Sequence, residues 1–442
     1  MKVFIVGDTG LLDGLALWPM AAPGDVLLYV EKDTIPPQVQ AELVRLAPEG
    51  IVIVGGPVRV SDAVEGLLSQ YAPTSRVAGN TRFTTPIEIA HTLYPVEPPV
   101  DPPVEPPAGA VVYPAGNHGD ITLTDSDVYI TAEPGATFGR ITLRNVNNVT
   151  LDGLHVDYIQ SERTSYATNV TVRRCVGETV NIQAPKTPTG IAAPSGWVVE
   201  YNDLTGGRYG LLVKADGPDY PPIVNTIIRY NRIGNTNVDG IQCAGYDGLT
   251  IHHNEFFGII ENGNHNDGLQ SVWGGKNLVF TNNYLHNNRC QPFFIKDGHV
   301  DGVVFAENLS IYNREPGPGE SGSSMYQVAH AEIYNNTIWD SSDFRLRSGQ
   351  KDDTYWPHGP LGPIAMHHNV LGLFTVLDAV DYPASVLNEH DNVIGKSWSW
   401  EDHLGSGSVI DPNPTFVNWR IDGYGITWNP TEQVYGVAAF NG

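Results

Sequence analysis

Two short segments of the chain are near-copies of each other and carry an aspartate at the same place. They read NVDGIQ at 237–242 and HNDGLQ at 265–270, so Asp239 matches Asp267 and Gln242 matches Gln270. If the segments are neighbouring parallel strands, about 4.8 Å apart, the two carboxylates lie within about 5 Å of each other. Like-charge repulsion would then raise the pKa of one of them. Such a pair suits a shared-proton or acid/nucleophile role.

Basic side chains accompany this aspartate pair. Lys214 follows an apolar run one repeat earlier, Lys296 follows one a repeat later, and His265 lies close to Asp267. A base beside carboxylates would suit β-elimination in a uronic acid glycan, whereas two carboxylates alone would suit hydrolysis. The candidate catalytic residues are Asp239, Asp267, Lys296 and His265. The candidate substrate-binding residues are Lys214, Gln242, Gln270, Trp273, Arg289 and Asp297, and the aromatic residues Tyr209 and Tyr246 are further candidates for stacking on sugar rings.

A structural interpretation of the same segments stays open. The sequence D-G-x-Q can begin a strand, because Asp caps backbone N–H groups and Gly adopts a positive φ. Aspartates and glutamines stacked in successive repeats would then be ladders that stabilise the fold without catalysis.

Two histidine pairs, His252-His253 and His367-His368, invite comparison with metal sites. Neighbouring side chains of a strand point to opposite faces, so we expect neither pair to chelate one ion. Asp216 and Asp219 could hold Ca²⁺, but their spacing is generic. No metal and no other cofactor is therefore predicted.

The pattern apolar-x-apolar-x-x-Asn-x-apolar recurs along residues 108–394. Successive Asn positions lie 23 residues (Asn231 to Asn254) to 33 residues (Asn336 to Asn369) apart. Alternation of apolar residues predicts strands that face a core, and Asn suits the turns because it tolerates the left-handed conformation and bonds to nearby backbone. We expect these residues to stack as a ladder. They are Asn202, Asn231, Asn254, Asn283, Asn308, Asn336 and Asn369, with a weaker copy at Asn392 and with Leu154 and Cys175 at the earlier positions.

A long period with three strand runs and a turn Asn in each repeat predicts a parallel β-helix. The repeats resemble right-handed, pectate-lyase-like β-helix repeats over most of the chain. The fold class is therefore expected to be mainly β, a right-handed parallel β-helix solenoid preceded by a small α/β Rossmann-like domain. A leucine-rich horseshoe is disfavoured, because the helical half of each repeat is missing. Residues 395–442 break the repeat and are expected to cap the last coil.

Residues 1–94 have an α/β pattern. Buried-strand runs at 3–6, 25–30 and 51–54 alternate with helical spacing at 37–46 and 62–71, where Ser61 is the expected N-cap and Gly50 the expected end of the first helix. Strands that alternate with helices predict a parallel sheet.

The same region carries a GGP turn at 55–57, a VS-x-x-V helix start and the run R-x-A-G-x-x-R-F-x-T from Arg76 to Thr85. These features resemble the type 2 cell-wall-binding repeat of Gram-positive surface proteins. The resemblance implies a Rossmann-like fold that binds anionic wall polymers, with Arg76 and Arg82 as candidate polymer-binding residues. That family usually has three tandem repeats and this chain has one, so a homotrimer would restore three copies.

Between the two regions, residues 95–107 contain seven prolines in thirteen residues. Such a segment favours an extended polyproline II spacer.

The formal net charge of -24, from 25 Lys and Arg against 49 Asp and Glu, excludes nucleic acid and an anionic membrane as partners. The three cysteines form no disulfide framework and are expected to be buried thiols.

The first residues contain only a four-residue apolar run, which is too short for a secretory signal, and no run is long enough to span a membrane. We therefore expect a virion protein of the phage tail. Such a receptor-binding spike would bind, and could depolymerise, host surface polysaccharide, with other tail proteins as partners. One alternative is a non-catalytic adhesin or structural tail fibre. Another is a wall-anchored secreted polysaccharide lyase at the cell surface.

Overall fold

The structure is a computed structural model of the 442-residue chain, and it divides into two units, Met1–Glu97 and Pro98–Gly442. No helix in the described part of the chain is long and apolar enough to cross a membrane. The described residues are 2–7, 25–77, 106–185, 191–215, 220–260, 263–296, 298–311, 323–338, 344–348, 361–377, 383, 385–398, 405–410, 420–422 and 425–427. Most of the expected proline spacer and most of the expected cap lie outside these ranges.

The first unit contains a parallel sheet with strand order β2-β1-β3-β4. Helix α2 ends at Leu46 and is capped by Ala47, which adopts the left-handed conformation, so the helix stops before the expected Gly50. Ser61 is the N-cap of α3, but its side chain makes no capping hydrogen bond. The elements are β1 (Lys2–Gly7), β2 (Val26–Val30), α2 (Pro37–Leu46), β3 (Gly50–Val54), α3 (Asp62–Leu68) and β4 (Thr74–Val77).

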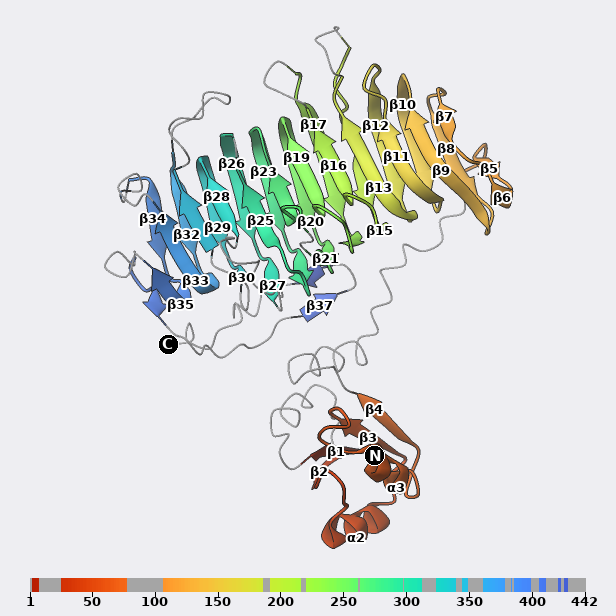
Figure 1. Ribbon diagram of the computed structural model, residues 1–442, viewed down its shortest axis with the longest axis vertical. Helices are drawn as coiled ribbons and strands as arrows, with labels where there is room; N and C mark the ends of the chain where they lie inside the picture. Colours follow the sequence, from red (N-terminus) through yellow and green to blue (C-terminus); the bar gives the residue numbers. More distant parts are fainter. Residues whose placement is uncertain are drawn as a thin grey trace. The chain divides into compact units, whose positions relative to one another are not determined.

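The second unit is a parallel β-helix, in which the strands of successive coils lie side by side (Figure 1). Its first wall is a sheet of twelve parallel strands. These are β5 (Val111–Tyr113), β8 (Val128–Ala132), β10 (Val146–Asp152), β12 (Ala167–Arg173), β14 (Val198–Glu200), β17 (Ile223–Arg229), β20 (Tyr246–His252), β23 (Gly275–Thr281), β26 (Val300–Ala306), β29 (Val328–Tyr334), β32 (Ile364–His367) and β34 (Leu387–His390).

Two further walls follow the first in each central coil. The second wall contains β15 (Asp203–Thr205), β18 (Arg232–Gly234), β21 (Glu255–Phe257), β24 (Tyr284–His286), β27 (Leu309–Ile311) and β30 (Thr337–Ile338). The third wall contains β16 (Leu211–Lys214), β19 (Ile241–Ala244), β22 (Asp267–Ser271), β25 (Gln291–Ile295), β28 (Ser324–Tyr326) and β31 (Phe344–Arg347).

Towards both ends of the solenoid, longer strands take the place of the separate second and third walls. β13 pairs with both β15 and β16, and β33 pairs with both β30 and β31. The parallel pairing continues to β36, past residue 394 where the β-helix was expected to end. The remaining strands are β6 (Gly116–Asn117), β7 (Ile121–Leu123), β9 (Ala136–Leu143), β11 (His155–Ser161), β13 (Val176–Gln183), β33 (Val370–Leu377), β35 (Val393–Trp398), β36 (Val409–Ile410) and the antiparallel pair β37 (Arg420–Asp422) and β38 (Gly425–Thr427).

The register keeps equivalent apolar residues in contact from coil to coil. In the first wall, Ile251 pairs with Phe280, which pairs with Phe305, and all three side chains are buried in the central core. Alternate residues of each strand face this core, because the side-chain period of a strand is two. The predicted solenoid of inward-facing alternating residues is confirmed.

The predicted asparagine ladder forms the corner between the first and second walls. In each coil the backbone N–H and the side-chain Nδ2 of one asparagine both donate to Oδ1 of the next, as from Asn254 to Asn283 at 3.0 and 3.1 Å. The same Nδ2 also donates to a carbonyl of the preceding coil, here Ile228 O at 3.0 Å. The ladder residues are completely or almost completely buried. Their side chains therefore supply the hydrogen bonds that water would otherwise make to the backbone at every corner. They are Asn202, Asn231, Asn254, Asn283, Asn308, Asn336, Asn369 and Asn392.

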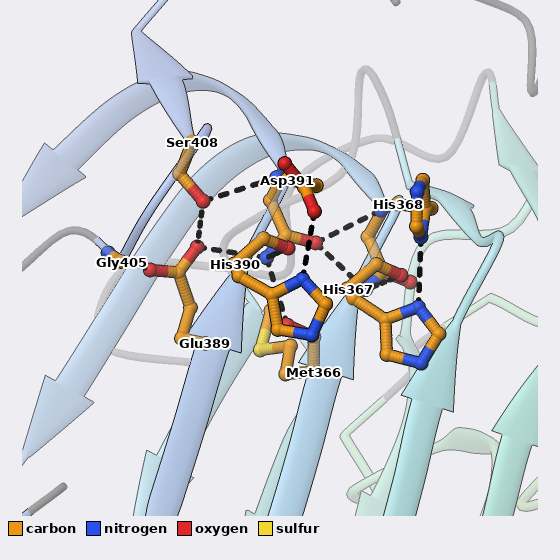
Figure 2. A network of polar contacts seen from close by, with 10 residues as sticks. Met366, His367, His368, Glu389, His390, Asp391, Gly405 and Ser408 are labelled. Atoms are coloured by element: carbon orange, nitrogen blue, oxygen red, sulfur yellow. Dashed lines mark hydrogen bonds and ion pairs between the residues drawn. The ribbon is translucent and has the colours of Figure 1, made fainter.

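Different residues close the two ends of the ladder. At the first end, the backbone N–H of Cys175 donates to Asn202 Oδ1 at 2.9 Å. At the last end, Asn392 donates its backbone N–H to Ser408 Oγ (3.0 Å) and its Nδ2 to Glu389 Oε1 (2.7 Å). The Glu389 carboxylate also accepts hydrogen bonds from Ser408 and from the backbone of Gly405 (Figure 2). No donor of the last asparagine is therefore left unpaired.

The left-handed conformation at these corners belongs to the residue before each asparagine, and not to the ladder asparagine as the sequence suggested. Tyr201, Tyr230, His253 and Glu307 all have φ between 56° and 59°. The corner therefore needs the asparagine for its amide group and accepts several residue types at the strained position.

Replacement of a central ladder residue tests this arrangement. Asn283→Ala removes two donated and two accepted hydrogen bonds at a buried site. We expect the free energy of unfolding to fall by roughly 2–4 kcal/mol, because the partners in adjacent coils lose their bonds without gaining water. Thermal unfolding followed by circular dichroism measures the loss. Asn282→Gly is the control, because the adjacent half-exposed residue has a φ of 55° that glycine accepts. Equal losses in the two variants would contradict a special role for the ladder.

Candidate functional site

The two aspartates lie on neighbouring coils, at the start of the third wall. Asp267 is the first residue of β22, and Asp239 precedes β19. The backbone N–H of Asp267 donates to Asp239 Oδ1 at 2.9 Å, and the N–H of Gly240 donates to the carbonyl of Asp267 at 2.8 Å. Both aspartate side chains are completely buried. The sequence placed the pair side by side but did not indicate this depth.

Two glutamines connect the carboxylates. Gln242 Nε2 donates to Asp239 Oδ2 (3.0 Å) and to Gln270 Oε1 (2.6 Å), and Gln270 Nε2 donates to Asp267 Oδ2 (2.7 Å). The glutamines are register partners on β19 and β22 and are half-exposed. The four matched residues therefore form one hydrogen-bonded unit, with amides at the surface and carboxylates beneath.

Burial dominates the electrostatics of this unit. Loss of water, followed by the charge of Asp267, raises the pKa of Asp239 to about 8. Burial also raises the pKa of Asp267, while His265 opposes that shift. Asp267 Oδ1 has no hydrogen-bond partner among the described residues. With a pKa of about 8, Asp239 is mostly protonated at neutral pH.

His265 links the buried pair to solvent. Its Nδ1 lies 3.0 Å from Asp267 Oδ2, and 45% of its side chain is exposed. The hydrogen bond to Asp267 raises the pKa of His265. The Nε2 atoms of Gln291 and His265 are 3.3 Å apart, and the imidazole lies against Phe294 with 5.2 Å between ring centroids. Of the candidate acid/base residues of this unit, His265 is the one that a bound molecule can touch.

A cation and an indole meet on the outer surface of the same wall. Lys214 Nζ lies 4.2 Å from the centre of the Trp273 ring. Ala244, the register partner of Lys214 on the intervening β19, is buried. Its small side chain leaves room for Lys214 and Trp273 to approach each other from coils two apart. The predicted binding residues Lys214 and Trp273 are thus brought together.

Further aromatic and basic residues continue this surface. Tyr326 is half-exposed and lies edge-on to the buried ring of Phe294, with 5.7 Å between centroids, and Arg347 lies 4.7 Å from the centre of the Tyr326 ring. Lys296 is exposed, with its Nζ 5.9 Å from the Phe294 ring. Sequence reasoning missed Phe294, Tyr326 and Arg347. The register of the third wall is the signal that could have found them, since Gln270 pairs with Phe294.

We call this surface the third-wall face. It comprises the outward side chains of β16, β19, β22, β25, β28 and β31 together with His265, Trp273 and Lys296. The six strands contain Lys214, Arg345 and Arg347, and their one carboxylate is the buried Asp267. In a chain with a net charge of -24, the exposed ionisable side chains of these strands are therefore cationic.

Other predicted binding residues lie elsewhere. Arg289 is exposed at the corner before β25, where its backbone forms an isolated parallel β-bridge with Ile260 of the preceding coil. Tyr246, expected as an exposed sugar-stacking residue, is instead buried in the core, with its hydroxyl 2.7 Å from Ser271 Oγ. Tyr209 is half-buried. Asp297, Asp216 and Asp219 lie outside the described residues.

In the first unit, the candidate polymer-binding residue Arg76 makes contacts within its own domain. Its guanidinium donates to Glu65 Oε2 at 2.9 and 2.7 Å and to the carbonyl of Gly55 at 2.8 Å. The side chain is 14% exposed. These bonds hold α3 against the turn that follows β3. Arg82 lies outside the described residues.

The described residues contain no group of three or more His, Cys, Asp or Glu side chains arranged to hold a metal ion. The histidine pairs nevertheless meet, contrary to expectation. The Nδ1 atoms are 2.8 Å apart in His252–His253 and again in His367–His368. Opposite faces were expected from strand geometry, but the second histidine of each pair is left-handed. The cysteines are free and buried, as predicted.

The raised pKa of Asp239 makes stability depend on pH. A folded pKa of about 8, above the ordinary value of 3.8, gives a stabilising contribution that is complete below about pH 4 and is lost as pH rises to about 8. The side chain in Asp239→Asn stays neutral at every pH. The free energy of unfolding of the wild type should therefore fall relative to that of this variant between pH 5 and 8, by at most about 1.4 kcal/mol per pH unit. Calorimetric unfolding at several pH values measures the difference. Asp247→Asn, at a half-exposed site of β20, should keep the wild-type profile. Parallel profiles for wild type and Asp239→Asn would refute the assignment of the proton.

Comparison with known proteins gives one family match. The family model described as "Right handed beta helix region" matches residues 157–338, which is less than half of the chain. No curated protein sequence matches the chain.

Among solved structures, Cwp6 from Clostridium difficile is 27% identical with a TM-score of 0.20, over 26% of this chain and 17% of that chain. The surface adhesin PfbA of Streptococcus pneumoniae is 12% identical with a TM-score of 0.41, over 72% and 86%. The Dettilon tailspike protein gp208 is 12% identical with a TM-score of 0.33, over 69% and 62%. The chain thus spans less than two thirds of Cwp6 and of the tailspike. The strand register and the family match together establish a right-handed parallel β-helix.

Proposed function

We propose that this protein binds polysaccharide at a bacterial surface through the third-wall face of its β-helix. The observation that carries the proposal is the row of cationic and aromatic side chains on this face, in a chain that is otherwise strongly acidic. An aromatic ring offers a flat apolar surface to the C–H face of a sugar, and the cations beside it attract acidic groups. The half-exposed amides of Gln242 and Gln270, on β19 and β22 of the same face, supply hydrogen bonds.

The face has the dimensions of an extended ligand. Six strands at a spacing of about 4.8 Å give a length of roughly 24 Å, so a chain of several sugars can lie along the solenoid axis. Most of these side chains lie on paired strands, and His265, Trp273 and Lys296 lie within two residues of a strand end, which favours a rigid, preformed site.

The biological setting that we propose is a phage tail. The protein would be a receptor-binding spike in the virion, with host surface polysaccharide, other tail proteins and two further copies of itself as partners. The first unit, which resembles a cell-wall-binding repeat, would bind wall polymer or attach the spike to the virion. A non-catalytic adhesin and a wall-anchored secreted lyase are the alternatives for the same glycan-binding face.

Depolymerisation is a second candidate function, favoured by the His265–Asp267 contact. A carboxylate that orients an imidazole and raises its pKa is suited to general acid–base chemistry. Since Asp239 and Asp267 are buried, His265 and the exposed Lys296 are the groups that would touch the glycan. The two aspartates would then act from beneath, by setting the charge and orientation of His265.

Binding is tested with Trp273→Ala and Lys214→Ala. We expect each change to weaken the affinity for an acidic bacterial polysaccharide by about 10-fold, equivalent to about 1.4 kcal/mol. The loss in Lys214→Ala should shrink at high salt, because salt screens the charge. Calorimetric titration with purified wall and capsular polysaccharides measures both. Lys276→Ala removes an exposed lysine of the first wall and should bind as the wild type does. Unchanged affinity in both third-wall variants would show that the polysaccharide does not bind at the third-wall face.

Catalysis is tested by following reducing ends and ultraviolet absorbance during incubation with the same polysaccharides. His265→Ala should abolish turnover, whereas Asp267→Asn should lower it and shift the pH optimum down, because the imidazole loses the carboxylate that raises its pKa. Absorbance by an unsaturated uronic product would identify a lyase, and reducing ends alone a hydrolase. Binding without turnover in the wild type would make the protein an adhesin and the buried pair a structural ladder.

A further inference from the structure

Two vicinal histidine pairs occupy equivalent corners of different coils. His252 and His367 are the last residues of β20 and β32. His253 and His368 follow them, and both have a φ of 56°. The left-handed residue turns the second side chain back towards the first, so the rings meet on the outside of the corner.

The geometry of the two pairs is nearly the same. The Nδ1 atoms are 2.8 Å apart in each pair, and the rings are close to perpendicular, at 84° and 89°. Between the two coils, register partners of His252 are Thr281, Ala306 and Tyr334. The arrangement is therefore a property of the two pairs and not of every corner.

We propose that each histidine pair chelates one Cu²⁺ or Ni²⁺ ion through its two Nδ1 atoms. Metal–imidazole bonds of about 2.0 Å that meet at a right angle place their nitrogens about 2.8 Å apart, whereas a tetrahedral angle needs about 3.3 Å. A right angle between nitrogen ligands is the preference of tetragonal Cu²⁺ and Ni²⁺. In the metal-free protein this separation is that of an N–H···N hydrogen bond, and it already matches the spacing of the right-angled geometry.

Binding needs a shift of tautomer and a turn of the rings that directs both Nδ1 lone pairs at the ion. In the absence of metal, one Nδ1–H of each pair donates to the other Nδ1. When both Nδ1 atoms ligate, that proton is lost from Nδ1 and the ring takes up a proton at Nε2, so both imidazoles remain neutral. Water would complete the coordination, because the described residues contain no group of three or more His, Cys, Asp or Glu side chains placed to hold a metal ion.

Neighbouring groups hold the rings in place. His390 stacks on His367 with 5.1 Å between centroids, and its Nδ1 lies 2.8 Å from Asp391 Oδ2 (Figure 2). At the other pair, Tyr230 lies 5.1 Å from the His253 ring. The nearby Arg229 is paired with Glu200 at 2.6 Å, which reduces its repulsion of a cation. Rings held by such contacts lose little conformational entropy on binding.

The test is a titration of untagged full-length protein with Cu²⁺ alone, followed by calorimetry and by electron paramagnetic resonance for nitrogen ligands. His253→Asn and His368→Asn should each bind one equivalent fewer than the wild type, and the double variant two fewer, with the corresponding nitrogen signature lost. Asparagine suits both positions, because Asn282 and Asn335 occupy the same left-handed corner in other coils.

His330→Asn is the matched control, since His330 is exposed, also has a positive φ (48°) and belongs to neither pair. It should bind as many equivalents as the wild type, and metal-free thermal unfolding should be alike in all variants. Equal stoichiometry in the wild type and the double variant would overturn the proposal. Polysaccharide binding should be the same in all these variants, so the result is independent of the function proposed above.

Discussion

The architecture depends on one repeated interaction, the bond between the buried amide of one asparagine and the backbone and amide of the next. A corner between two walls interrupts strand pairing and leaves buried backbone groups without partners. The ladder supplies those partners at every coil from Asn202 to Asn392. Because each asparagine binds the coil before it and the coil after it, the ladder also fixes the register. The third-wall face inherits its alignment from that register, which stacks Gln242 on Gln270.

Much of the fold could be predicted from the sequence, because the asparagine recurs with apolar residues at fixed distances on both sides. The conformation of the preceding residue could not. Tyr201, His253 and Glu307 share no property that marks a left-handed position, and the surrounding hydrogen bonds impose it on them. The end of the ladder was also beyond prediction, since Glu389 and Ser408 meet only after a whole coil has folded between them.

The candidate site was predicted in part for the same reason. The matched segments placed Asp239 beside Asp267 and Gln242 beside Gln270, since equal positions in successive repeats become neighbours. The burial of the two aspartate side chains could not be predicted from the matched segments. Burial of the carboxylates depends on how the corner before the third wall folds, and the inward position of Tyr246 depends on which residues of β20 face the core. Side chains from coils two apart, such as Lys214 and Trp273, meet across the small Ala244 between them.

The ladder has a direction, and this bears on how such proteins change in length during evolution. Every internal asparagine presents the same donors to the next asparagine and the same acceptor to the preceding one, and its Nδ2 also donates to a carbonyl of the preceding coil. A complete coil can therefore be duplicated or deleted between two asparagines without a change in any corner bond. The ends are not interchangeable in this way, because Cys175 closes one and the Glu389–Ser408 pair closes the other. Gene rearrangements should accordingly vary the number of coils in the middle while the two terminal sequences are retained.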